Sequence, residues 1–199
     1  TIEDHICKRY SMNINKILIL GSTLLSELSV NLLKEHYDLV GHVPSLKPTT
    51  KGVINLPVVD IESECDIMLS IQYDKVVKNV EKCFNVHTGL LPEYGGTNIL
   101  SYTIKNKEKE QGLTFHKMTN QLDYGPIISK ITYPVLKEDE PFDLFKRVLE
   151  VGPFFILSSL NILKKMSLDQ ISNCPKESPH MYKRGEFLAD KKITRYRHD

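Results

Sequence analysis

Three polar side chains on two turns of this chain are suited to moving a proton. Asn85 and His87 stand two residues apart before a turn that ends in a leucine–proline pair, and Asp123 directly precedes a tyrosine–glycine–proline turn. An amide and an imidazole can donate hydrogen bonds to an oxygen that becomes negatively charged, and an imidazole changes protonation near neutral pH. A nearby carboxylate can orient that imidazole and favour its charged form. The pattern predicts a site that stabilises an oxyanion and shuttles a proton.

The same region contains no recognisable nucleophile. The chain has no G-x-S-x-G motif, and Cys83 has no neighbour that would activate a thiol. The cysteines lie far apart without a C-x-x-C pair, which is typical of buried free thiols in a reducing compartment; they are Cys7, Cys65, Cys83 and Cys174. Oxyanion donors without a nucleophile favour direct transfer between two bound substrates, and an amine that attacks a carbonyl fits this best.

Plainer interpretations of these residues stay open on the residues alone. An N-x-H pair at a strand end often makes ordinary turn hydrogen bonds, and aspartate is a good turn former. The glycines at 21 and 95–96 can be simple turn or loop residues, because one glycine is no phosphate-binding fingerprint. His87, His116 and Asp123 match no zinc-ligand spacing, so no metal is expected. The residues alone therefore predict a ligand-binding domain, with acyl transfer as a hypothesis.

The composition predicts one globular domain with a sizeable core. The chain has 199 residues, of which 41% are hydrophobic and 26% charged. Its net charge of +1 gives no broad footprint for nucleic acid, no apolar run is long enough to span a membrane, and no signal peptide is visible. We expect a cytoplasmic protein without nucleic-acid or membrane partners, and a homodimer because dimers are common among metabolic enzymes.

The hydrophobic pattern predicts a doubly wound α/β domain with a mostly parallel sheet. Strands are expected at 16–20, 38–43, 66–71, 83–87, 112–118 and 127–135, with a short edge strand over 53–59 interrupted by Pro57. Because sites form at the carboxyl ends of such strands, Asn85 and His87 should share one face at the end of strand 83–87.

Three helices are expected between these strands. The first begins at a Ser22 or Thr23 cap and is predicted to bury one face, made of Leu25, Leu28 and Leu32. The second is expected over 97–106. The third runs over 141–166 and should be kinked or split where a glycine–proline pair occupies 152–153.

Three ordered motifs resemble those of the folate-dependent formyltransferases, a family of glycinamide ribonucleotide, methionyl-tRNA and nucleotide-sugar N-formyltransferases. They are the stretch 85–96, the G-x-T-x-H motif at 112–116 and the L-D-x-G motif at 122–125. The resemblance implies a Rossmann-like catalytic domain over 12–166, an N-terminal extension over 1–11 and a short C-terminal tail over 167–199 that packs on the domain. The segment from residue 179 could close the site, join an interface or cover the core.

The resemblance implies transfer of a formyl group from N10-formyltetrahydrofolate to a primary amine, by direct attack through a tetrahedral intermediate and without a metal. By match, the catalytic residues are Asn85, His87 and Asp123. The folate co-substrate is expected at Leu69, Ile71, Tyr73, Leu91, Asn120, Leu122 and Tyr124. The amine substrate is expected at Gly21, Ser22, Pro92, Tyr94, Gly95, Gly96 and Asn98.

Departures from the family patterns bear on the amine acceptor. Methionyl-tRNA enzymes carry a further tRNA-gripping domain where this chain has a short polar tail, and the loop after the first strand lacks the phosphate-loop composition of glycinamide ribonucleotide enzymes. The stretches 69–73 and 181–184 look most like compact nucleotide-sugar N-formyltransferases, although the N-terminal half is shorter by about one βα unit. The expected acceptor is an amino-sugar nucleotide, and phosphoribosylglycinamide is the alternative. A formyltetrahydrofolate hydrolase and an inactive folate- or nucleotide-binding module are further alternatives.

Overall fold

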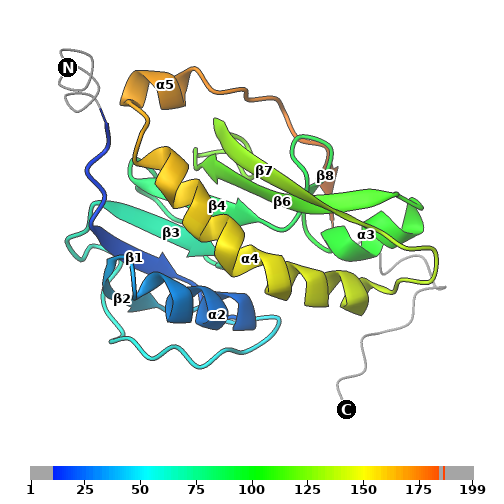
Figure 1. The fold of residues 1–199 in the computed structure, drawn as a ribbon, viewed down its shortest axis with the longest axis horizontal. Helices are drawn as coiled ribbons and strands as arrows, with labels where there is room; N and C mark the ends of the chain where they lie inside the picture. Colours follow the sequence, from blue (N-terminus) through cyan, green and yellow to red (C-terminus); the bar gives the residue numbers. More distant parts are fainter. Residues whose placement is uncertain (1–10, 184–185, 187–199) are drawn as a thin grey trace.

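Six strands form one mostly parallel sheet in a computed structural model that describes residues 11–183 and 186 (Figure 1). The strand order is β2-β1-β3-β4-β6-β7. The parallel strands are β1 (Lys16–Leu20), β2 (Asp38–Val43), β3 (Ile67–Ile71) and β4 (Cys83–His87). The antiparallel strands are β6 (Glu110–Lys117) and β7 (Ile127–Pro134). The predicted α/β class is confirmed, and the bounds of three strands match those expected.

Each central strand is buried on both faces, which is why it reads as a continuous apolar run. One face packs in a large core with the helices, to which Ile19, Leu69 and Phe115 contribute. On the other face, Leu20 and Cys83 lie in a smaller cluster together with side chains from the loops between 59 and 80. The sheet thus has an outer face that is covered by loops, and the polar side chains of the site project from this face.

Helix α2 (Leu24–Leu33) begins as expected at Thr23, whose hydroxyl accepts a hydrogen bond from the Ser26 amide at 3.3 Å. The predicted apolar face is confirmed at Leu25 but wrong at Leu28. Leu25 and Leu33 are fully buried, whereas Leu28 is 37% exposed. Ser29 lies between the two buried leucines in the sequence and donates its hydroxyl to the Leu25 carbonyl, so the buried face of α2 includes a small polar residue.

Helix α4 (Pro141–Leu163) runs without a break through Gly152 and Pro153, so of the predicted kink or split the split is wrong, and the kink stays a prediction. Both residues are buried, and a Cβ at position 152 would lie 2.6 Å from the Leu25 side chain. The glycine therefore lets α2 pack closely on α4. The packing of this apolar face outweighs the hydrogen bond that Pro153 cannot donate. Both helices lie on the same face of the sheet (Figure 1).

The segment 53–59 does not form the predicted edge strand. It makes one isolated bridge to His42, through hydrogen bonds at the Pro57 carbonyl and the Val59 amide. Pro57 has no N–H to extend a ladder, and Val53 and Val58 are 77% and 68% exposed. This edge of the sheet is consequently covered by irregular chain.

The remaining elements border the site. Helix α3 (Ile99–Lys105) confirms the expected helix, and α5 (Leu168–Ser172) follows α4. The two-residue strands β5 (Gly95–Gly96) and β8 (Met181–Tyr182) pair in parallel, so a late segment of the chain lies beside the loop after β4. Of the expected extension over 1–11 only residue 11 is described, and the tail beyond 183 lies outside the described residues except for residue 186.

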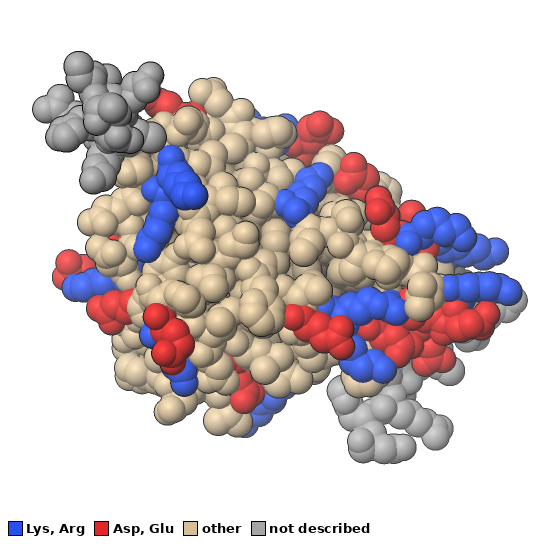
Figure 2. Space-filling view, viewed as in Figure 1, with Lys and Arg blue, Asp and Glu red and all other residues tan. Residues whose placement is uncertain are grey.

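The face that carries α2 and α4 has no patch of a single charge (Figure 2). Lys and Arg alternate with Asp and Glu at the end of the molecule near α3, and the centre of this face is largely uncharged. Among the described residues, no helix is both long and apolar enough to cross a membrane.

Candidate functional site

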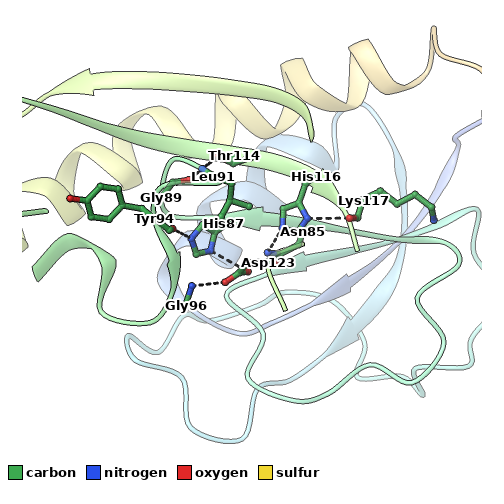
Figure 3. A network of polar contacts seen from close by, with 10 residues as sticks. All are labelled: Asn85, His87, Gly89, Leu91, Tyr94, Gly96, Thr114, His116, Lys117 and Asp123. Carbon is green, nitrogen blue, oxygen red and sulfur yellow. Dashed lines mark hydrogen bonds and ion pairs between the residues drawn. The ribbon is translucent and has the colours of Figure 1, made fainter. Parts of the chain in front are cut away.

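The candidate site lies on the outer face of the sheet, at the carboxyl end of β4 (Figure 3). Asn85 on β4 stands in register with Ser70 on β3 and with His116 on β6, and His87 stands opposite Thr114. Residues in register project from the same face of a sheet. The ladder therefore brings an amide and two imidazoles together, as the period of two predicts for Asn85 and His87.

His116 holds the amide of Asn85 in one orientation. Its Nδ1 lies 3.1 Å from the Lys117 carbonyl and its Nε2 lies 3.1 Å from Nδ2 of Asn85. A carbonyl only accepts, so Nδ1 carries the proton and Nε2 accepts from the amide. Burial, together with the neighbouring His87, lowers the pKa of His116 to about 4, so this ring is neutral at pH 7. One N–H of Asn85 is thus committed to His116, and the second is left for a ligand.

His87 has both ring nitrogens close to oxygen acceptors. Nε2 lies 2.6 Å from the carbonyl of Tyr94, and Nδ1 lies 3.4 Å from Oδ1 of Asp123. Because the Tyr94 carbonyl only accepts, it fixes a proton on Nε2. A proton that enters or leaves His87 therefore does so at Nδ1, the nitrogen that faces the carboxylate.

Asp123 is held by its own backbone and by a loop amide. Its φ of +49° lies in the left-handed region, which aspartate tolerates better than most side chains. Oδ2 accepts a hydrogen bond from the Gly96 amide at 2.7 Å, while Oδ1 faces His87. Left-handed conformations at residues other than glycine concentrate at functional sites, where the surrounding structure imposes them. The buried carboxylate is thereby aimed at the imidazole.

Thr114 holds the turn that follows His87. Its buried hydroxyl donates to the Gly89 carbonyl at 2.7 Å and accepts from the Leu91 amide at 3.1 Å (Figure 3). The sequence showed Thr114 and His116 as parts of one motif but gave neither a role. Their alternation along one strand was the available signal, because it places both on the face that carries the site.

The described thiols are not suited to act as nucleophiles. Burial raises the pKa of the Cys83 thiol to about 11, and it also raises the pKa values of Cys65 and Cys174. A protonated thiol is a weak nucleophile at neutral pH. Within the described part of the chain, no cluster of three or more His, Cys, Asp or Glu side chains could hold a metal ion.

The residues expected to contact the folate fall into two groups. Leu69, Ile71 and Leu91 have side chains that are at most 1% exposed, which leaves only their backbone for a ligand. The other four lie at or near the surface: Tyr73, Asn120, Leu122 and Tyr124. Gln72, which sequence reasoning missed, follows β3 with a φ of +53°, and its buried Oε1 has no hydrogen-bond partner.

The residues expected to contact the amine substrate are also divided. Gly21 and Ser22 follow β1, two strands from β4, where a Cβ at Gly21 would lie 2.3 Å from the Ile71 carbonyl and the Ser22 hydroxyl accepts from the Ser45 amide. The others lie between β4 and α3: Pro92, Tyr94, Gly95, Gly96 and Asn98.

Within that loop, the ring of Tyr94 points away from His87 and its hydroxyl donates to Glu108 (Figure 3). Only its carbonyl reaches the imidazole. Gly95 and Gly96 pair with β8, and Asn98 adopts a φ of +59° at the start of α3 without a side-chain capping bond. The side chain of Tyr94 thus supports the loop, and its backbone is the part that contacts the trio.

Comparison with known proteins finds similarity to a formyl transferase family model and to two curated proteins. Residues 66–160 match the family described as formyl transferase. The bifunctional polymyxin resistance protein ArnA of Wigglesworthia glossinidia brevipalpis is 29% identical over 142 residues, which cover 67% of this chain and 22% of that protein. The methionyl-tRNA formyltransferase of Natranaerobius thermophilus is 29% identical over 116 residues, which cover 57% of this chain and 37% of that enzyme. The chain thus spans well under half the length of these two relatives.

Solved structures share the fold. The N-formyltransferase from Helicobacter canadensis, in complex with folinic acid and dTDP-3-aminofucose, aligns with a TM-score of 0.72 and 24% identity over 87% of this chain and 72% of that one. WlaRD, a sugar 3N-formyl transferase with dTDP and 5-N-formyl-THF, aligns with a TM-score of 0.71 and 22% identity. The alignment covers 87% of this chain and 71% of WlaRD. The phosphoribosylglycinamide formyltransferase of Anaplasma phagocytophilum aligns with a TM-score of 0.65 and 18% identity. The alignment covers 86% of this chain and 100% of that enzyme.

Proposed function

Because residues 66–160 match the formyl transferase family, we propose that this chain transfers a formyl group from N10-formyltetrahydrofolate to a primary amine of an amino-sugar nucleotide. The observation that carries the proposal is how His87 is held: its Nε2 lies 2.6 Å from the Tyr94 carbonyl, and its Nδ1 faces Oδ1 of Asp123 at 3.4 Å. Donors for an oxyanion and one free proton position are what direct transfer to an amine requires.

The residues beside the trio fit a folate. The unpaired Oε1 of Gln72 is a buried acceptor, and the pteridine ring of a folate carries N–H donors that match it. Leu122 is 64% exposed directly before Asp123, which suits contact with a flat ring system. Gln72, Tyr73, Leu122 and Tyr124 would hold the co-substrate, which supplies the electrophilic formyl carbon when bound.

The roles of the trio follow from their atoms. The N–H of Asn85 that His116 does not use donates to the carbonyl oxygen on which negative charge develops. Nδ1 of His87 takes the proton that the attacking amine releases and passes it to the nitrogen that leaves. Asp123 compensates the positive charge of the ring while that proton is present. With thiols of raised pKa nearby, the chain forms no covalent intermediate in this scheme.

Two observations support a nucleotide-sugar acceptor. The sugar N-formyltransferase structures named above share the fold over 87% of this chain, and they were determined with dTDP or dTDP-3-aminofucose and a folate. The tail segment beside the loop after β4 also places β8 next to the expected acceptor residues. The cytoplasmic location, the homodimer and the domain limits of 12–166 stay predictions of the sequence.

A substrate panel tests the proposal. The full chain is incubated with N10-formyltetrahydrofolate and, separately, with dTDP- and GDP-linked amino sugars, glycinamide ribonucleotide or methionyl-tRNA. Mass spectrometry then reads a formyl gain on the acceptor, and absorbance reads tetrahydrofolate release. We expect formylation of an amino-sugar nucleotide. A formyl gain on another acceptor alone would overturn the sugar assignment, and tetrahydrofolate release without any amine would identify a hydrolase.

A further inference from the structure

Strand β8 holds the loop that contacts both His87 and Asp123. Backbone hydrogen bonds join the Gly95 amide to the His180 carbonyl, the Thr97 amide to the Tyr182 carbonyl, and the His180 amide to the Pro92 carbonyl, at 2.8 to 2.9 Å. The same loop presents the Tyr94 carbonyl to His87 and the Gly96 amide to Asp123. A segment from the end of the described chain thus sets the position of two backbone groups in the candidate site.

The two loop glycines are required by this pairing. A Cβ at Gly95 would lie 2.7 Å from the Pro179 side chain, and a Cβ at Gly96 would lie 2.2 Å from the Tyr182 carbonyl oxygen. Their absence of side chains lets β8 approach, but it also leaves the loop without anchors of its own at these two positions. The contacts with β8 therefore hold the loop in place where β5 has no side chains to do so.

An aromatic cluster fixes β8 in register. The ring of Tyr182 stacks on Tyr94 at 5.0 Å between centroids, packs on Tyr102 at 4.3 Å and meets the edge of His180 at 4.6 Å. Asn106 donates hydrogen bonds to the hydroxyls of both Tyr94 and Tyr182, at 2.8 and 3.0 Å. Aromatic pairs of this kind contribute beyond the area that they bury. The cluster ties β8 to the side chain whose carbonyl meets His87.

We propose that Tyr182 is a positioning residue of the transferase site: by stacking on Tyr94 it holds the Tyr94 carbonyl on Nε2 of His87 and the Gly96 amide on Asp123. The inference rests on the proposed function only for its kinetic consequence. Tyr182 itself contacts neither His87 nor Asp123 in these networks, and it acts through the loop. Without it, the His87 ring is free to rotate or change tautomer, and its Nδ1 no longer faces the carboxylate.

Kinetics of Tyr182→Ala in the full chain provide the first test. We expect kcat to fall about 100-fold, since displacing a catalytic group by about 1 Å costs a factor of this size, while the KM for the folate stays unchanged. Tyr182→Phe keeps the stacked ring and should retain kcat within about tenfold, because it loses one hydrogen bond. Phe154→Ala, which removes a 65% exposed ring on α4, is the matched control and should behave as wild type. Wild-type kcat in Tyr182→Ala would overturn the proposal.

A spectroscopic readout separates this inference from the proposed activity. In the wild type, the His87 Nε2–H bonded to the Tyr94 carbonyl should give a slowly exchanging imidazole proton signal by NMR, assigned by its loss in His87→Gln. We expect this signal to disappear in Tyr182→Ala and to persist in Tyr182→Phe. If Tyr182→Ala does not fold, Asn106→Ala, which removes both phenol hydrogen bonds, should weaken the same signal. An unchanged signal in the folded variant overturns the proposal, even when no substrate is turned over by the wild type.

Discussion

The two halves of the candidate site are built in different ways. In the strand-borne half, Asn85, His87, Thr114 and His116 project from β4 and β6, whose register fixes their spacing. In the loop-borne half, Asp123, the Tyr94 carbonyl and the Gly96 amide come from loops that a left-handed backbone and β8 hold in place. Since regular ladders need no distant support, the backbone of the strand-borne half should tolerate loop variants, whereas the orientation of the His87 ring depends on the Tyr94 carbonyl. The loop-borne half should lose its alignment before it loses its fold.

The largest effect is expected at the strand-borne imidazole. His87→Ala removes the only proton shuttle of the proposed mechanism, so kcat should fall roughly 1,000-fold. The strand should persist because the turn after it is held by Thr114. The measurement is formyl transfer under saturating substrates, with His36→Ala, an exposed histidine after α2, as the control. A loss smaller than tenfold would remove His87 from the chemistry.

The loop-borne carboxylate should matter less than the imidazole that it orients. Asp123→Asn keeps an acceptor for the Gly96 amide and suits the left-handed backbone, so the thermal midpoint should stay close to that of the wild type. The charge that balances a protonated His87 is lost, and we expect kcat to fall about 100-fold. Asp38→Asn at the exposed start of β2 is the control. An unchanged kcat would mean that Asp123 only shapes its turn.

The contact between the strand-borne half and the turn after His87 can be broken at Thr114. Thr114→Val leaves the buried carbonyl of Gly89 and the amide of Leu91 without partners, which should lower the free energy of unfolding by about 1–3 kcal/mol. The turn after His87 should then shift, and we expect kcat to fall about tenfold. Thr114→Ser keeps the hydroxyl and should restore both values. Urea unfolding measures the free energy of unfolding of each variant, and initial rates measure kcat. Equal stability of the Thr114→Val and Thr114→Ser variants would contradict the expected role.

The strand-borne half was predictable from the sequence. The apolar run that ends in Asn85-Val86-His87 gave the bounds of β4 and the shared face of both side chains, because the period of a strand is a local property. The predictions that failed depended on neighbours. Leu28 was expected to be buried, but it is 37% exposed, and the glycine at 152 lets α4 pack against Leu25 instead.

The loop-borne half was predictable only in part. Asp123 was found by its motif, but the contact of His87 with the Tyr94 carbonyl uses a backbone oxygen, and any residue at position 94 would present one. The pairing of Gly95 and Gly96 with β8 likewise depends on a segment far along the chain. Local patterns carry no information on such contacts, so the sequence could predict ligand contacts at these glycines but not their pairing with β8.

The smallest effect on activity is expected where the strand-borne half supports itself. In His116→Gln, the glutamine oxygen can still accept from the Asn85 amide, so kcat at pH 7 should fall by less than about tenfold, the value of one ordinary hydrogen bond. A glutamine does not titrate, however. The variant should therefore differ from the wild type in how its stability responds to pH.

The direction follows from the pKa of His116, which is about 4 in the folded chain and near 6.5 when the chain is unfolded. Between these values the unfolded chain binds the proton and the folded chain does not. Acidification through this window should thus lower the free energy of unfolding of the wild type, by up to about 1.4 kcal/mol per pH unit from this residue. The slope should be shallower in His116→Gln, as measured by urea unfolding at pH 7.0, 5.5 and 4.5. Equal slopes would mean that His116 is protonated in the fold and that the Asn85 amide is not donating to it.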